Sequence, residues 1–239
     1  MLAALAVFAV SAVASASASA VEFQICAEGG GSGTKYSEHK CTTEEASGKW
    51  EWVTFKVGLE NKVVSKGGEF KLTAGTKVIT CKKVKDEGLI AEGGAGEATA
   101  ITFEECSTSE AKCLVKSKGG TNGKVVVTAV PTQLVEREPS GGGTKKLANE
   151  FKQNATTKEF VTLQFEKEGG GTCSTLPETK VKGQVAAEAI NLATSGEAEL
   201  NFPSPELKGN SLEAFGVAAK LTGKDTEILS NAWGVRALK

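Results

Sequence analysis

Short runs in which apolar and polar residues alternate recur along most of the chain. The clearest covers residues 50–59, where Val53 and Phe55 share one face and Trp50 and Trp52 share the other. A period of two predicts a β-strand, because successive side chains of a strand point to opposite faces. Further strands are predicted over residues 77–85, 98–106, 124–130, 159–166 and 179–190.

Glycine-rich segments separate these runs and predict turns, because glycine adopts positive φ at little cost. The segment 118–123 contains Asn-Gly and predicts a hairpin between a strand over residues 113–117 and the run that follows. We therefore expect an all-β fold, either an antiparallel sandwich or a barrel. A β-solenoid is the alternative, but the spacing of the glycines varies too much for a fixed repeat.

One segment carries a weak helical pattern. Leu147 and Phe151 lie four positions apart within residues 145–153, so we expect at most one short helix. Alternation resumes after residue 190, and prolines at positions 203 and 205 interrupt it without resembling a linker. We predict one β domain over residues 45–239, preceded by a cysteine-closed flap over residues 21–44.

The first 20 residues have the pattern of a secretory signal peptide. An uncharged apolar run is followed by small residues that end in Ala18-Ser19-Ala20, which predicts Val21 as the first mature residue. The basic residues that usually precede the apolar run are missing. A membrane anchor is the alternative, but the run is too short to span a bilayer, so no membrane span is expected after cleavage.

The chain has six cysteines, and all of them follow the predicted cleavage point. An even number in an exported chain favours disulfides and an extracellular or cell-surface location. We predict the pairs Cys26–Cys41, Cys106–Cys113 and Cys81–Cys173. A zinc site is the rival interpretation, but the chain has one histidine and no C-x-x-C motif, so we expect neither a metal nor another cofactor.

Charge and composition argue against several functions. The net charge is −1, with lysine and glutamate interspersed, so nucleic acid is not an expected partner. A Ser-His-Asp site would have to use His39, and aspartate occurs only at Asp86 and Asp225. Adjacent Glu104 and Glu105 would point to opposite faces of a strand and would not flank one glycosidic bond. No catalytic residue is therefore predicted.

The aromatic residues Trp50, Trp52 and Tyr36 are the predicted binding residues. If Val53 and Phe55 face the core, the two tryptophans stand side by side on the outer face, where they would stack on sugar rings or dock a partner. The alternative is that the flap or a second sheet covers them.

The middle of the chain resembles a family of secreted actinobacterial proteins that has no assigned activity. The resemblance rests on the sequences VITCKKVKDEGLI from position 78, ITFEEC from 101 with Cys113, GKVVVT from 123, FVTLQF from 160 with Cys173, and VKGQVAAEAINL from 181. It covers residues 75–200. It implies export and β structure, and it assigns no activity to the chain.

These observations favour a non-enzymatic exported protein that is either structural or a binding module of the cell surface, with a cell-surface polysaccharide or protein as partner. Carbohydrate or cell-wall binding through Trp50 and Trp52 is the second hypothesis. A glutamate-dependent hydrolase is the third, and it needs two carboxylates that converge in one cleft.

Overall fold

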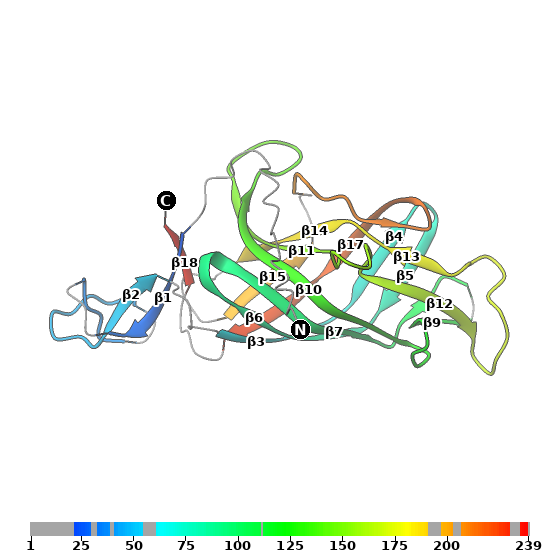
Figure 1. Ribbon diagram of the computed structural model, residues 1–239, viewed down its shortest axis with the longest axis horizontal. Helices are drawn as coiled ribbons and strands as arrows, with labels where there is room; N and C mark the ends of the chain where they lie inside the picture. Colours follow the sequence, from blue (N-terminus) through cyan, green and yellow to red (C-terminus); the bar gives the residue numbers. More distant parts are fainter. Residues whose placement is uncertain are drawn as a thin grey trace, which may run out of the picture.

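A computed structural model describes residues 22–29, 33–38, 41–54, 61–110, 112–190, 197–202, 207–229 and 235–238 (Figure 1). The predicted signal peptide, His39 and residues 55–59 of the first predicted strand lie outside these ranges. The all-β prediction is confirmed. The one helical element in the described ranges is the 3-10 turn η1 (Glu92–Gly94).

Eight strands form a closed antiparallel barrel. In order around the barrel they are β3 (Asn61–Gly67), β6 (Lys83–Ile90), β7 (Ala95–Glu104), β10 (Lys124–Arg137), β11 (Lys146–Lys152), β14 (Gln184–Ile190), β15 (Glu197–Phe202) and β17 (Val217–Leu229). The sheet closes because β3 pairs with β6 on one side and with β17 on the other. Closure leaves no free sheet edge along this part of the chain.

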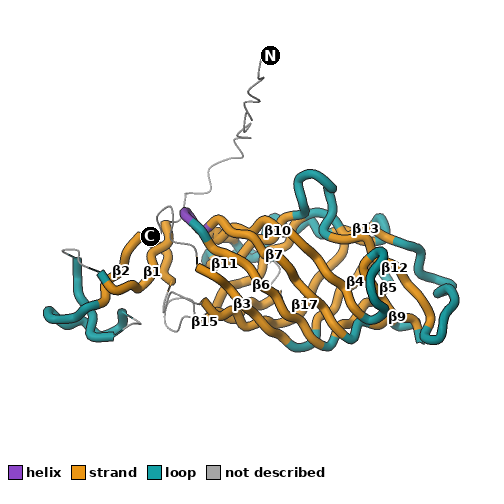
Figure 2. Tube along the Cα trace, turned by 60° about the horizontal axis from the view of Figure 1, so that its bottom comes forward, coloured by secondary structure: helices purple, strands orange, loops and turns teal. Residues whose placement is uncertain are grey.

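The sheet continues beyond the barrel through the first half of β17, which pairs with β4. This extension contains β4 (Phe70–Ala74), β5 (Lys77–Cys81), β8 (Ser107–Thr108), β9 (Cys113–Ser117), β12 (Val161–Lys167), β13 (Thr179–Val181) and the short β16 (Glu213–Ala214). Figure 2 shows the extension prolonging the barrel along its length. One apolar core therefore runs through both, with Ile79 and Leu163 from the extension and Phe151 and Leu200 from the barrel.

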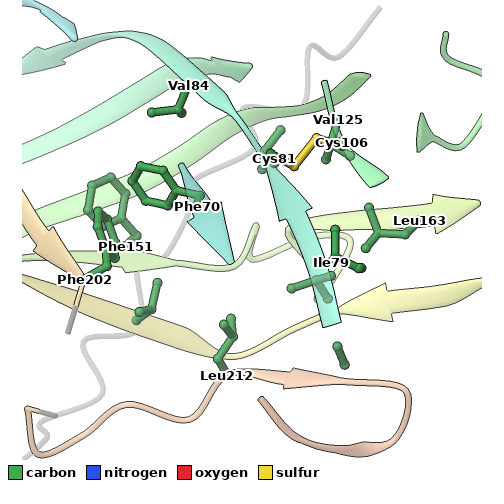
Figure 3. Close-up of a cluster of buried hydrophobic side chains, with 14 of the residues drawn as sticks. Phe70, Ile79, Cys81, Val84, Cys106, Val125, Phe151, Leu163, Phe202 and Leu212 are labelled. Carbon is green, nitrogen blue, oxygen red and sulfur yellow. A yellow bond between two sulfur atoms is a disulfide. The ribbon is translucent and has the colours of Figure 1, made fainter. Parts of the chain in front are cut away.

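Aromatic side chains organise the middle of this core (Figure 3). The ring of Phe70 packs edge-to-face against Phe103 and Phe202, with centroids 5.6 Å and 5.4 Å apart. Phe151 adds a tilted contact with Phe202 at 5.6 Å. These contacts join β4, β7, β11 and β15, so the rings link opposite walls of the barrel.

A separate three-stranded sheet contains β1 (Glu22–Glu28), β2 (Trp50–Thr54) and β18 (Val235–Leu238), in the order β18-β1-β2. It lies at one end of the barrel (Figure 1). Segments from both ends of the described chain meet in it, because β1 pairs with β2 and with β18. The domain limits predicted at residues 44 and 45 stay a prediction.

The prediction of at most one short helix is confirmed, but its suggested place over residues 145–153 is wrong, because this segment contains β11. Leu147, Asn149 and Phe151 occupy alternate positions on one side of the strand. On the other side Ala148 and Glu150 are buried as well, Ala148 beneath Leu207. Burial on both sides hides the period of two that identifies a half-exposed strand.

The hairpin predicted across residues 118–123 is also wrong, although the turn itself forms with Gly119 and Gly123 at positive φ. The two strands that flank the turn do not pair with each other. β9, before the turn, pairs with β8 and β12, whereas β10, after it, pairs with β7 and β11. Ser117 occupies the point where the strands part. Its hydroxyl accepts a hydrogen bond from the Val126 amide at 2.6 Å and donates to the Val126 carbonyl at 3.0 Å.

Candidate functional site

A cavity of about 120 Å³ lies in the core where the barrel joins the extension. Its lining is almost entirely apolar and includes Phe70, Ile79, Val127, Phe151, Leu200 and Leu221. Phe70, Ile79 and Phe151 of this lining are labelled in Figure 3. An apolar cavity of this size has room for a molecule about as large as benzene.

Two acidic residues interrupt the apolar lining of the cavity: Asp86 on β6 and Asp225 on β17. They are the only aspartates in the chain. A third acid, Glu227, lies two positions after Asp225 on the same face of β17. The pairing of β17 with β3 and of β3 with β6 places Glu227, Ser65 and Asp86 in one row across three strands. The three carboxyl groups therefore form one cluster on the inner wall.

The carboxyl cluster is buried and incompletely hydrogen-bonded. Asp86, Asp225 and Glu227 are 7%, 4% and 6% exposed. The hydroxyl of Ser65 donates to Oδ2 of Asp225 at 2.5 Å, and Nδ2 of Asn149 donates to Oε1 of Glu227 at 3.4 Å. The other carboxylate oxygen of Asp225, Oδ1, is buried and has no hydrogen-bond partner among the described residues. An unpaired buried acceptor is rare and costly.

Burial raises the pKa of all three carboxyl groups of the cluster. It raises the pKa of Asp86 to about 7, and the charge of Asp225 adds to the rise. Burial raises the pKa of Asp225, opposed by hydrogen bonds from Ser65 and the Thr226 amide. The pKa of Glu227 is raised well above its ordinary value by burial, and then by the charges of Asp86 and Asp225. These shifts follow because a charged carboxylate loses its hydration when it is buried beside another.

A much smaller cavity of about 10 Å³ lies on another side of the same cluster. Asp86 lines both cavities, and Glu227, Asn149 and Thr132 line the smaller one. Its volume is about what one water molecule needs. No group of three or more His, Cys, Asp and Glu residues in the described ranges is arranged to hold a metal ion.

The aromatic residues predicted from the sequence lie elsewhere, in the three-stranded sheet. Trp50 and Trp52 are partly buried and pack against Tyr36 and the half-cystines Cys26 and Cys41. Beneath them the chain between the two cysteines is tied to β2 by hydrogen bonds between the backbones of Tyr36 and Trp50. The structure thus brings the three predicted residues together around the Cys26–Cys41 disulfide.

The disulfide predictions are partly corrected. Cys26 pairs with Cys41 as predicted, but Cys81 pairs with Cys106, and Cys113 pairs with Cys173. Cys106 directly precedes β8, which pairs with β5, and this places it beside Cys81 at the end of β5. Cys113 begins β9 opposite Lys167 of β12, and the Glu166–Thr172 bridge returns the chain so that Cys173 reaches it.

The adjacent glutamates lie at the surface and are paired with lysines. Glu105 contacts Lys82 and Lys83, and Glu104 contacts Lys85. No helix in the described ranges is long and apolar enough to cross a membrane.

The acidic cluster was missed from the sequence, although a signal for it was present. In β6 the alternation places Asp86 on the same face as Val84 and Ile90, which is the core face. A lone acid among apolar residues on a core face indicates a special environment, because acidic side chains are seldom fully buried without a partner. No family model matches the chain, no curated protein matches it and no solved structure matches it, so the carboxyl-lined cavity is interpreted from its own geometry.

Proposed function

We propose that this protein is exported, acts at the cell surface or outside the cell, and binds one small molecule with an apolar body inside its barrel without catalysing a reaction. The observation that carries the proposal is the apolar cavity of about 120 Å³ in the core. Barrels of eight strands are wide enough either to be filled by side chains or to hold one small ligand. The three disulfides support the location, because such cross-links are typical of extracellular proteins.

The energetic cost of the cavity supports a binding role. At about 24 cal/mol per Å³, a void of this volume costs about 3 kcal/mol relative to a filled core. The carboxyl cluster, which is costly to bury, lies on the wall of the same void. Two destabilising features at one place are typical of a functional site, because a core selected only for stability would be filled with apolar side chains.

The hydrolase hypothesis receives less support from this geometry. Buried carboxyl groups with raised pKa values meet the chemical needs of an acid catalyst. However, the wall opposite Asp86 and Asp225 is apolar, and it offers sugar hydroxyls no hydrogen-bond partners. Carbohydrate binding through Trp50 and Trp52 stays a hypothesis, as does membership of the secreted actinobacterial family.

Titration of the full, oxidised chain with toluene tests the binding proposal. We expect saturable binding of one molecule per chain, with shifts of the Val127 and Leu200 methyl signals in NMR spectra. Val127→Phe places a larger side chain in the cavity and is expected to abolish binding, because the cavity is then filled. Val126→Phe makes the same change at the next position of β10, on the opposite face, and is the matched control.

Binding that is equal in the two phenylalanine variants would locate the toluene site outside the barrel. Absence of saturable binding to the unaltered chain would overturn the proposed function itself.

A further inference from the structure

We propose that the molecule bound in the barrel is a small primary amine, with its apolar body in the cavity and its ammonium group bound by Asp86 and Asp225. The inference rests on the proposed function, and it adds the chemical class of the ligand. The lining provides two different environments, because apolar side chains surround most of the space and two carboxyl groups form one part of its wall.

The polar part of the site contains carboxyl groups and no positively charged side chain among the described residues. No lysine or arginine in the described ranges lines either cavity. The cluster consists of Asp86 from β6 and of Asp225 and Glu227 from β17. The polar groups around it are Ser65 from β3, Asn149 from β11 and, across the smaller cavity, Glu97 from β7 and Thr132 from β10. An uncompensated group of carboxylates favours a positively charged ligand and repels a negatively charged one.

The hydrogen bonds at the cluster identify an open acceptor. Ser65 occupies Oδ2 of Asp225, and Asn149 occupies Oε1 of Glu227. Oδ1 of Asp225 has no partner in the described ranges, and the Asp225 side chain lines the cavity. A ligand that donates hydrogen bonds from inside the cavity would satisfy this atom. An ammonium group has three donors and a positive charge, whereas a hydroxyl group has one donor and no charge.

Binding of an amine is expected to release a proton, whereas binding of a neutral ligand is not. Burial raises the pKa of Asp86 to about 7, so most Asp86 side chains are protonated near pH 6. An alkylammonium ion keeps its proton in this range, as lysine does. When it binds, it favours the ionised form of Asp86 or Asp225, so the carboxyl proton leaves to the solvent. We therefore expect release of up to one proton for each amine bound.

A series of ligands with the same five-carbon body tests the inference on the oxidised full chain. Isothermal titration with n-pentylamine, 1-pentanol and pentanoate compares an ammonium, a hydroxyl and a carboxylate group. We expect n-pentylamine to bind roughly 10- to 100-fold more tightly than 1-pentanol, the range of a charge-assisted hydrogen bond, and pentanoate to bind most weakly. Titrations at pH 6 in buffers of different ionisation enthalpy should show proton release with the amine and none with the alcohol.

Asp225→Asn removes the charge while keeping the shape of the side chain. We expect it to lose the preference for n-pentylamine over 1-pentanol and to bind toluene as the unaltered chain does, which also shows that it is folded. Glu199→Gln is the matched control. Glu199 lies on the neighbouring strand β15, is paired with Lys224 at 2.7 Å and is exposed, so this change should leave the preference intact.

The outcomes separate the two proposals. Toluene binding without preference for the amine and without proton release would overturn the amine inference and leave the cavity proposal standing. Failure of toluene and all three pentyl compounds to bind would overturn both. An amine preference that survives in Asp225→Asn would also overturn the assignment to this cluster, and if that variant does not fold, proton release by the unaltered chain decides.

Discussion

Asp86→Asn is expected to raise the free energy of unfolding by about 4 kcal/mol at pH 8 and to change it little at pH 4. The pKa of Asp86 is about 7 in the folded protein, against an ordinary value of 3.8. A difference of about 3 units at 1.36 kcal/mol each gives this magnitude. Because the folded pKa is raised, the stability contributed by protonated Asp86 is fully present below about pH 4 and is lost as the pH rises through 7. Asparagine cannot ionise and avoids the loss.

The difference in unfolding free energy between the variant and the unaltered chain, measured by urea denaturation from pH 4 to pH 8, checks this prediction. The difference is the useful quantity, because surface carboxylates with lowered pKa values, such as Glu110 and Glu166, act in the opposite direction in both proteins. A flat or falling difference for Asp86→Asn would mean that the buried carboxyl group is not destabilised by ionisation.

Removal of the Cys113–Cys173 disulfide by Cys113→Ala with Cys173→Ala is expected to lower the free energy of unfolding by about 4 kcal/mol. This disulfide closes a loop of 60 residues, and the entropy that it removes from the unfolded chain grows with the logarithm of loop length. It also fixes the segment after β12, where the Glu110 carboxylate accepts hydrogen bonds from the amides and hydroxyls of Ser174 and Thr175.

The matched control is the double alanine variant of the Cys26–Cys41 disulfide, which closes 15 residues and should cost about 3 kcal/mol. Chemical denaturation without reductant measures both losses. A smaller loss for the long loop than for the short one would contradict the entropic explanation.

Local alternation predicted most strands because one face of each is buried and the other is solvated. It failed at two kinds of position. In β11 both faces are buried, so the period was hidden. Residues 77–85 and 179–190 read as single strands, but each divides in two, β5 from β6 and β13 from β14. At the second break, Gly183 has φ +99°, and a Cβ there would lie 2.0 Å from the carbonyl oxygen of Ser211, a contact that only the folded chain creates.

The candidate site depends on pairings between distant segments. Asp86 and Asp225 are 139 positions apart in the sequence (225 − 86), and they meet because β3 pairs with both of their strands. Nothing in the residues around either aspartate specifies that pairing. The same holds for Cys106 and Cys113, whose closeness in sequence suggested a bond, whereas in the structure each pairs with a cysteine from another part of the chain.

By itself the sequence determined the class of fold, the places where the chain turns and the use of its cysteines as cross-links, because each follows from the chemistry of neighbouring residues. Only the tertiary structure decided that the sheet closes, which cysteines pair and that two isolated aspartates share one apolar cavity. Those features depend on contacts between strands far apart in the chain, which no local pattern of side chains encodes.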